Sequence, residues 1–274
     1  MDLIEILKAI FLGIVEGITE WLPISSTGHM LLVDEFLTLN MSDSFKEMFF
    51  VVIQLGAILA VVVFFWKKMI PIQLEDRSKP LIKMDTISMW LKVVVACIPG
   101  AIVTLLFDDY IEAHLHTAPV IAAMLIVYGV AFIVIETWNK YQVPTVPRLE
   151  DITYRTAFII GLFQVLSIIP GTSRSGATIV GALLIGVSRV AAAEFTFFLA
   201  VPVMFGLSAI KLLKFGFSFT GPELLVLGAG TLVAFLTSVV VIKFLMGYIR
   251  KHDFKVFGWY RIALGVIVLL VTLL

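Results

Sequence analysis

The chain has 274 residues, of which 60% are hydrophobic and 15% are charged, with equal numbers of acidic and basic side chains. A mean hydropathy of +1.06 leaves too little polar surface to keep a soluble domain of this size in solution. The composition therefore excludes a soluble globular protein and indicates a polytopic membrane protein. The single cysteine, Cys97, excludes an intramolecular disulfide.

Ten apolar segments follow one another along the chain, five in each half. They cover about 2–22, 24–38, 48–66, 88–107, 118–138, 154–169, 174–187, 191–213, 223–245 and 255–274. The first two segments of each half are short and are separated by a polar break, whereas the next three are long enough to cross a bilayer. We therefore predict an all-α polytopic membrane protein with six transmembrane helices and two re-entrant helix-loop-helix pairs.

The two broken pairs resemble each other in sequence. Residues 13–28 (GIVEGITEWLPISSTG) and 161–176 (GLFQVLSIIPGTSRSG) superpose at an offset of 148, with Glu16 on Gln164. Each copy has an apolar half-helix, a proline, a break rich in hydroxyl residues and a second apolar helix. Interrupted, duplicated segments are where membrane transporters place their binding sites.

An odd number of crossings separates the two copies, so they are expected to lie upside down relative to each other. We predict one integral membrane domain, 1–274, built of two inverted repeats over about 1–140 and 150–274. One re-entrant pair would enter from each side of the membrane, and the two tips would meet near the midplane.

Basic residues predict the orientation. They gather in three loops, at Lys67, Lys68, Arg77, Lys79 and Lys83, at Lys140, Arg148 and Arg155, and at Arg250, Lys251 and Lys255. Loops rich in lysine and arginine are cytoplasmic as a rule. This orientation places both termini outside.

The polar breaks predict an anion site. Hydroxyl residues at Ser25-Ser26-Thr27 and at Thr172-Ser173 are suited to cap the helix that follows, and the N-terminus of a helix attracts anions. Arg174 adds a planar, permanent charge that suits phosphate oxygens, with Ser173, Ser175 and Thr178 around it. The alternative is that the hydroxyls only cap helices and that Arg174 snorkels to the membrane surface.

Two carboxylates share one helix face in the first copy. Glu16 and Glu20 are four residues apart, near the negative end of a helix dipole, where a carboxylate pair needs a neutralising partner. Mg²⁺ suits the pair, since it binds one or two carboxylates together with substrate phosphate oxygens. The alternative, that one glutamate pairs with Arg174, is compatible with the metal site.

His29 lies three residues beyond Ser26, so the two can share a helix face. This spacing suggests a hydroxyl nucleophile with a nearby general acid or base. The alternative is a histidine that only satisfies a polar contact. Arg261, inside the last apolar segment, is expected to snorkel to the membrane surface beside Trp259 or Tyr260.

The motifs EGITE, LPISSTGH and PGTSRSGAT resemble the paired motifs of the undecaprenyl pyrophosphate phosphatase family, also called the bacitracin-resistance protein. The resemblance spans the whole chain. It implies an enzyme of the bacterial plasma membrane that hydrolyses C55 polyprenyl diphosphate to the monophosphate and phosphate, with its active site open to the external face. It also implies a dependence on Mg²⁺ or Ca²⁺. The expected partners are this lipid and the surrounding membrane, without nucleic acid, and a homo-oligomer is left open.

On this interpretation the site residues have three roles. The catalytic group is Glu20, Ser26, His29 and Arg174; the diphosphate-binding group is Ser25, Thr27, Ser173, Arg174, Ser175 and Thr178; and the metal ligands are Glu16 and Glu20. Ser26 would attack phosphorus and His29 would exchange the proton, although water or His29 itself could attack instead. The rival hypothesis is a secondary transporter or lipid flippase that uses the same two breaks, because inverted repeats with broken helices are also typical of transporters.

Overall fold

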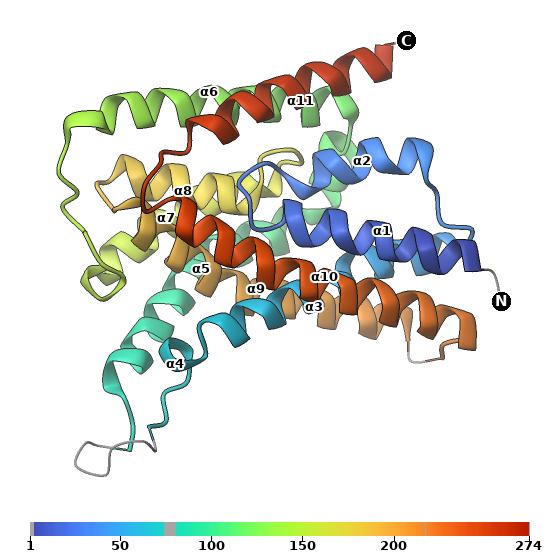
Figure 1. The fold of residues 1–274 in the computed structure, drawn as a ribbon, viewed down its shortest axis with the longest axis horizontal. Coiled ribbons are helices and arrows are strands. Elements are labelled where there is room, and N and C mark those ends of the chain that lie inside the picture. Colours follow the sequence, from blue (N-terminus) through green and yellow to red (C-terminus); the bar gives the residue numbers. More distant parts are fainter. Residues whose placement is uncertain (1–2, 74–80, 217, 274) are drawn as a thin grey trace.

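The computed structural model describes residues 3–73, 81–216 and 218–273, and within these ranges the regular secondary structure is helical, with two isolated β-bridges (Figure 1). The helices are α1 (Leu3–Thr19), α2 (Ser26–Phe36), α3 (Asp43–Phe64), α4 (Trp66–Met69), α5 (Met84–Leu115), α6 (Ala118–Trp138), η1 (Asn139–Tyr141), η2 (Leu149–Asp151), α7 (Tyr154–Val165), η3 (Leu166–Ile168), α8 (Arg174–Leu184), α9 (Arg189–Phe215), α10 (Gly221–Tyr248) and α11 (Lys255–Leu273). The expected all-α class is confirmed.

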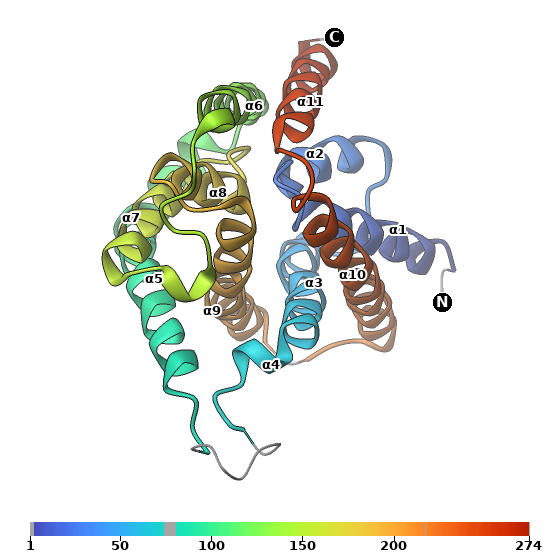
Figure 2. The same ribbon diagram turned by 60° about the vertical axis from the view of Figure 1, so that its left-hand side comes forward.

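Six helices of the described chain are long and apolar enough to cross a membrane, namely α3, α5, α6, α9, α10 and α11. This confirms the predicted number of spans and a multi-pass membrane protein. Four shorter apolar helices, α1, α2, α7 and α8, have 17, 11, 12 and 11 residues. In Figures 1 and 2, α1 and α2 occupy one half of the bundle, whereas α7 and α8 occupy the other.

Each of the helices that precede a break packs on a long helix from the other half of the sequence. α1 lies along α10, and its counterpart α7 lies along α5. Glycine permits both contacts, because a Cβ at Gly13 would lie 2.5 Å from the carbonyl oxygen of Gly230, and a Cβ at Gly161 would lie 2.4 Å from that of Ala96. Small residues at such positions are what allow membrane helices to approach closely. Gly13 and Gly161 are equivalent in the two matching sequences.

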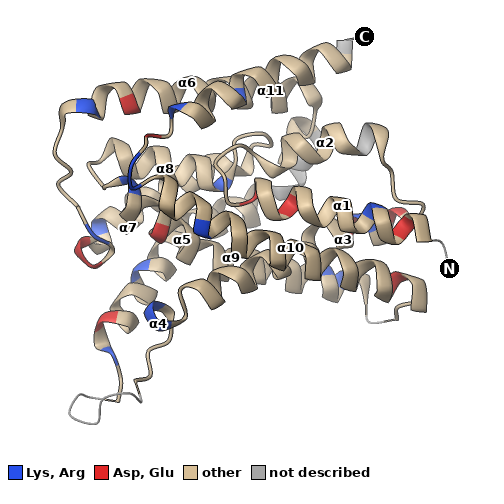
Figure 3. Ribbon diagram, in the orientation of Figure 1, with Lys and Arg blue, Asp and Glu red and all other residues tan. Residues whose placement is uncertain are grey.

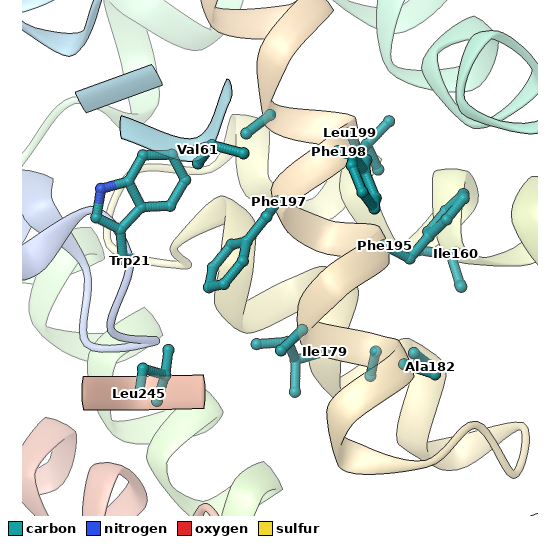
Figure 4. Close-up of a cluster of buried hydrophobic side chains, with 14 of the residues drawn as sticks. Trp21, Val61, Ile160, Ile179, Ala182, Phe195, Phe197, Phe198, Leu199 and Leu245 are labelled. Carbon is teal, nitrogen blue, oxygen red and sulfur yellow. The ribbon is translucent and has the colours of Figure 1, made fainter. Parts of the chain in front are cut away.

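A buried aromatic contact holds the first break against the centre of the molecule (Figure 4). Trp21 follows the end of α1, and its ring meets that of Phe197 from α9 edge to face, with centroids 5.3 Å apart. Both side chains are fully buried. An edge-to-face pair of this kind adds about 0.5–1.5 kcal/mol to the burial of the two rings, so the backbone next to Glu20 is firmly anchored.

Charged residues are sparse along the long helices and gather toward their ends (Figure 3). Basic residues lie around α4, around α7 and in the connection from α10 to α11, at the end of the bundle opposite to the start of α1 and the finish of α11. Arg77 and Lys79, which were part of the predicted basic loop, lie outside the described residues. The structure thus places the basic loops together at one end.

Candidate active site

The two breaks have the same backbone conformation. The residues that cap α2 and α8 are Ser25 and Ser173, with φ of 74° and 69°, and they are the only non-glycine residues with positive φ in the described part of the chain. Each serine hydroxyl accepts a hydrogen bond from a backbone N–H of the helix that follows, at Gly28 (3.4 Å) and at Gly176 (3.2 Å). Such strained residues persist only where the surroundings enforce them, and they cluster at functional sites.

Glu20 connects the two breaks. One carboxylate oxygen, Oε2, accepts the Ser26 hydroxyl at 2.9 Å, and the other, Oε1, accepts Nη2 of Arg174 at 3.2 Å. The Ser175 hydroxyl also lies 3.5 Å from the Glu20 carbonyl oxygen. The structure therefore brings together a carboxylate and a hydroxyl from the first copy with an arginine from the second. The ion pair between a glutamate and Arg174, which the sequence left as an alternative, is present.

Arg174 faces inward. Its side chain is 11% exposed, and its guanidinium donates to the carbonyl oxygen of Thr196 at 3.1 Å as well as to Glu20. Thr178 supports this arrangement, since its hydroxyl lies 3.0 Å from the Arg174 carbonyl oxygen and 2.8 Å from the Thr196 hydroxyl. The alternative in which Arg174 snorkels to the membrane surface is thus wrong. A buried guanidinium with a fixed fork suits an anion that replaces part of its present contacts.

The other hydroxyls surround the start of α8. Ser173 and Ser175 lie 3.2 Å apart, with Ser175 buried and Ser173 half-buried. Thr27, at the start of α2, is exposed. Hydroxyl donors and free N–H groups at a helix start, next to an arginine, form a set of donors of the kind that binds phosphate.

Glu16 lies one helical turn before Glu20 and is 1% exposed. Its Oε1 is one of four buried side-chain polar atoms without a hydrogen-bond partner in the described residues, and the others are Trp21 Nε1, Gln164 Oε1 and Thr172 Oγ1. All four belong to the two matching segments. A buried carboxylate oxygen without a partner is costly unless a cation or a proton meets it.

The carboxylate pair fits a divalent cation that takes its remaining ligands from substrate. No group of three or more His, Cys, Asp or Glu side chains that could hold a metal occurs among the described residues. Mg²⁺ needs no such group, because it binds through one or two carboxylates and fills its shell with phosphate oxygens and water. Glu16, with its unpartnered oxygen, and Glu20 meet this requirement.

His29 contacts the first break from α2. Its Nδ1 lies 2.8 Å from the Ser25 carbonyl oxygen, and since a carbonyl only accepts, Nδ1 carries the proton. Its Nε2 lies 2.7 Å from the hydroxyl of Tyr260, and the two rings stack. The structure joins the Ser26 hydroxyl to Glu20 and not to His29, so proton exchange between His29 and Ser26 stays a prediction.

Two residues that contact the candidate site, Thr196 and Arg261, lie outside the sequence motifs. Thr196 lies in the middle of an apolar span and gives no signal of its own. Arg261 does give one, because an arginine at membrane depth is a functional candidate by default. The expectation that Arg261 snorkels is wrong: it is 0% exposed and donates to backbone carbonyls of both breaks, including Pro23 (3.2 Å) and Gly171 (2.8 Å).

Fold and site together define a multi-pass membrane protein in which a serine, a carboxylate and an arginine are in contact, a set of side chains suited to phosphoryl chemistry. Residues 9–267 match the family described as bacitracin resistance protein BacA, and the chain belongs to this family. The chain is 74% identical, over 99% of both sequences, to an undecaprenyl-diphosphatase of Enterococcus faecalis. It is 66% identical to the undecaprenyl-diphosphatase of Desulfitobacterium hafniense, over 98% of this chain and 97% of the other.

Proposed function

We propose that this protein is an undecaprenyl-diphosphatase, which hydrolyses the C55 lipid diphosphate to the lipid monophosphate and inorganic phosphate. The names of the relatives support this activity. The observation that carries it is the contact of one carboxylate, Glu20, with both the Ser26 hydroxyl and the Arg174 guanidinium. These three groups supply a nucleophile, a base and a charge stabiliser for phosphoryl transfer.

The terminal phosphate would lie between the starts of α2 and α8. Arg174 would exchange part of its contact with Glu20 for two phosphate oxygens, because its planar fork matches their spacing. Ser173 and Ser175 would donate their hydroxyl protons to the same group, with further donors from Ser25, Thr27 and Thr178. This binding set holds the phosphorus atom next to Ser26, at the point where the two breaks meet.

The reaction would take two displacements. In the first, the Ser26 oxygen bonds to phosphorus, the bond from phosphorus to the bridging oxygen breaks, and lipid monophosphate leaves. The hydroxyl proton passes to Glu20, which already accepts it as a hydrogen bond. Glu20 then passes this proton to the departing lipid phosphate and is ionised again. In the second displacement, Glu20 takes a proton from water, the water oxygen bonds to the phosphoserine phosphorus, and the bond from phosphorus to the Ser26 oxygen breaks. Glu20 returns the proton to the Ser26 oxygen as inorganic phosphate leaves. His29 stays a candidate for proton exchange in either step.

Glu16 and Glu20 would hold a divalent cation, Mg²⁺ or Ca²⁺. A cation at this position supplies charge neutralisation for the diphosphate. The unpartnered buried oxygen of Glu16 supports this assignment. With a cation present, Glu16 and Glu20 no longer repel each other, and the carboxylates are held in the orientation that the Ser26 proton requires.

The protein would act in the bacterial plasma membrane with its site open to the external face. We take the two halves as inverted repeats, with α1–α2 and α7–α8 as re-entrant pairs. The basic loops then lie in the cytoplasm and both termini lie outside, in accord with the rule for positive charges. Release of the monophosphate recycles the lipid carrier of cell-wall synthesis, which accounts for resistance to bacitracin. The enzyme names of the relatives give no support to a transporter.

The test is phosphate release from C55 polyprenyl diphosphate by the purified protein in detergent. We expect release with Mg²⁺ or Ca²⁺, loss of release with a chelator, and recovery when the cation is added back. Arg174→Ala serves as the inactive comparison. Well-folded protein that releases no phosphate with either cation would reject the phosphatase.

A further inference from the structure

Arg261 is a charged side chain at the centre of the molecule. It projects from α11 and is 0% exposed, and its guanidinium lies 5.6 Å from the ring centroid of Tyr128 in α6. It forms no salt bridge with any acidic side chain in the described parts of the chain. A charge at this depth without a carboxylate partner is expensive to retain, so its contacts must be specific.

Within the described residues, every hydrogen-bond acceptor of the Arg261 guanidinium is a backbone carbonyl oxygen. Nη1 donates to Pro23 at 3.2 Å, and Nη2 donates to Gly171 at 2.8 Å and to Thr172 at 2.9 Å. Longer contacts reach Met124 and Leu125 in α6, both at 3.4 Å. One guanidinium therefore links the first break, the second break and α6.

The two breaks are held at equivalent positions. Pro23 and Gly171 occupy the same place in the two matching sequences, at the offset of 148. Each lies two residues before a serine with positive φ, Ser25 or Ser173. Arg261 thus binds the two breaks at equivalent carbonyls, each two residues before a serine cap.

Substrate binding makes this link important. In the proposed reaction Arg174 gives up part of its contact with Glu20 in order to bind phosphate, which weakens the ion pair between the two breaks. The hydrogen bonds from Arg261 to Pro23 and Gly171 involve none of the atoms that meet substrate. They persist when the ion pair opens, so they can keep Ser26 and Arg174 directed at the same phosphorus atom.

We propose that Arg261 is a positioning residue for phosphoryl transfer, one that fixes the two breaks relative to each other through equivalent backbone carbonyls. This inference rests on the proposed phosphatase activity for its kinetic consequences. The geometric consequence, a fixed distance between α2 and α8, is independent of that activity. Arg261 does not meet substrate and acts only through the backbone of the breaks.

The kinetic test compares Arg261→Lys and Arg261→Met with the unchanged protein at matched amounts of folded enzyme. Lysine keeps the charge but cannot span several carbonyls with a planar fork. We expect kcat to fall about 10–100-fold in the lysine variant, since small misplacements of reacting groups cost this much. KM should change less than about threefold, because the lipid and its phosphates still meet their own contacts.

Arg189→Lys is the matched control. Arg189 also makes a charged hydrogen-bonded contact inside the bundle, with the buried Glu136, at the end where the basic loops lie. Its lysine variant should lower the thermal unfolding temperature but leave kcat unchanged. An Arg261→Lys protein with unchanged kcat per folded molecule would overturn the positioning role, even if its stability fell. If the Arg261→Met protein does not fold, the kcat of the Arg261→Lys protein decides the test.

A distance measurement separates this proposal from the proposed function. Spin labels at Phe36→Cys and Leu184→Cys, both exposed and at the far ends of α2 and α8, would be introduced with Cys97→Ala. We expect a narrow distance distribution that broadens or shifts with Arg261→Lys and not with Arg189→Lys. If this outcome were seen in a protein without phosphatase activity, it would support the positioning role of Arg261 and reject only the proposed phosphatase function. An unchanged distribution would overturn the proposal.

Discussion

Glu20 has two carboxylate oxygens, and each already serves a different partner. Oε2 accepts the Ser26 hydroxyl and Oε1 accepts Arg174. A carboxylate held on both sides has a fixed orientation, and in the proposed reaction its contact with the Ser26 hydroxyl would orient the serine. The same carboxylate is 9% exposed, so little water competes for its oxygens. In the proposed reaction, this environment would let Glu20 act as the base, while its contact with Arg174 links it to the second break.

Replacement of Arg174 tests the charge that meets phosphate. Arg174→Ala should lower kcat/KM by about 10³-fold or more, because a preorganised charge in a dry site is lost. Arg174→Lys should recover little of this, since the planar fork is lost with it. Steady-state phosphate release measures both. Arg148→Ala, at an exposed arginine paired with Asp151, is the matched control and should retain the full rate.

Replacement of Ser26 tests the covalent route. Ser26→Ala should lower kcat by about 10³-fold, because the nucleophile that splits the reaction into two steps is absent. In the unchanged protein, an acid-quenched reaction should yield a phosphoserine that mass spectrometry locates at Ser26. Ser44→Ala, at an exposed serine in the first turn of α3, should behave like the unchanged protein. A Ser26→Ala protein with a normal rate would exclude this nucleophile.

At this scale the sequence predicted the candidate site residues and left an ion pair between a glutamate and Arg174 as an alternative, but it did not predict their other contacts. Polar residues in an apolar chain attract attention individually, which is why Glu20, Ser26 and Arg174 could be identified. Their contacts depend on how two distant segments meet. The Thr196 carbonyl and the Arg261 side chain enter the site from later helices, and no local pattern specifies which span will lie beside a break.

The short helices depend on close packing more than on length. α1 and α7 reach their long neighbours through glycine, where the backbones come within contact distance. α2 and α8 are both 11 residues long, and both begin after a serine cap at equivalent positions. Sequence alone predicted the starts of these helices from the hydroxyl breaks. It did not predict that helix α5 extends to Leu115, because the apolar pattern ends earlier.

Alanine at the glycine contacts should separate helices. A Cβ at Gly161 would lie 2.4 Å from the Ala96 carbonyl oxygen, so α7 must move away from α5. We expect Gly161→Ala to cost about 1–3 kcal/mol of stability, seen as a lower unfolding temperature in detergent. Gly13→Ala, at the equivalent contact with α10, should behave in the same way.

Gly206→Ala is the control for this pair, because nothing lies within 4 Å of a Cβ at that position in α9. It should leave the unfolding temperature unchanged or raise it slightly, since alanine favours helix more than glycine does. If Gly206→Ala and Gly161→Ala changed the unfolding temperature equally, the close contact of α7 with α5 would not be the cause of the change.

The whole molecule has basic loops at one end and the start of α1 and the finish of α11 at the other (Figures 1 and 3). The sequence predicted the six long spans because each is a continuous apolar run. It gave no indication that α1 would pack on α10 or α7 on α5. Those contacts join distant parts of the chain, such as Gly13 with Gly230 and Gly161 with Ala96, and depend on the complementarity of surfaces that hydropathy does not describe.

Cysteine labelling tests the orientation of the molecule. With Cys97→Ala as background, Phe36→Cys and Val143→Cys place thiols at opposite ends, on side chains that are 83% and 88% exposed. A membrane-impermeant maleimide should label position 36 in intact cells and position 143 only after the membrane is opened, because the basic loops are retained inside. The reverse pattern would contradict external termini.

The contact of α1 with α10 also has a consequence for biosynthesis. α1 leaves the ribosome well before its packing partner, which begins at Gly221, about 200 residues later. At 5–20 residues per second, α1 waits roughly 10–40 s before its neighbour exists. During this interval the face of α1 at Gly13 and Gly17 lacks the α10 surface that it packs against in the folded protein. Nascent chains should therefore need help from the insertion machinery, and truncations before α10 should be degraded rather than accumulate as a folded half.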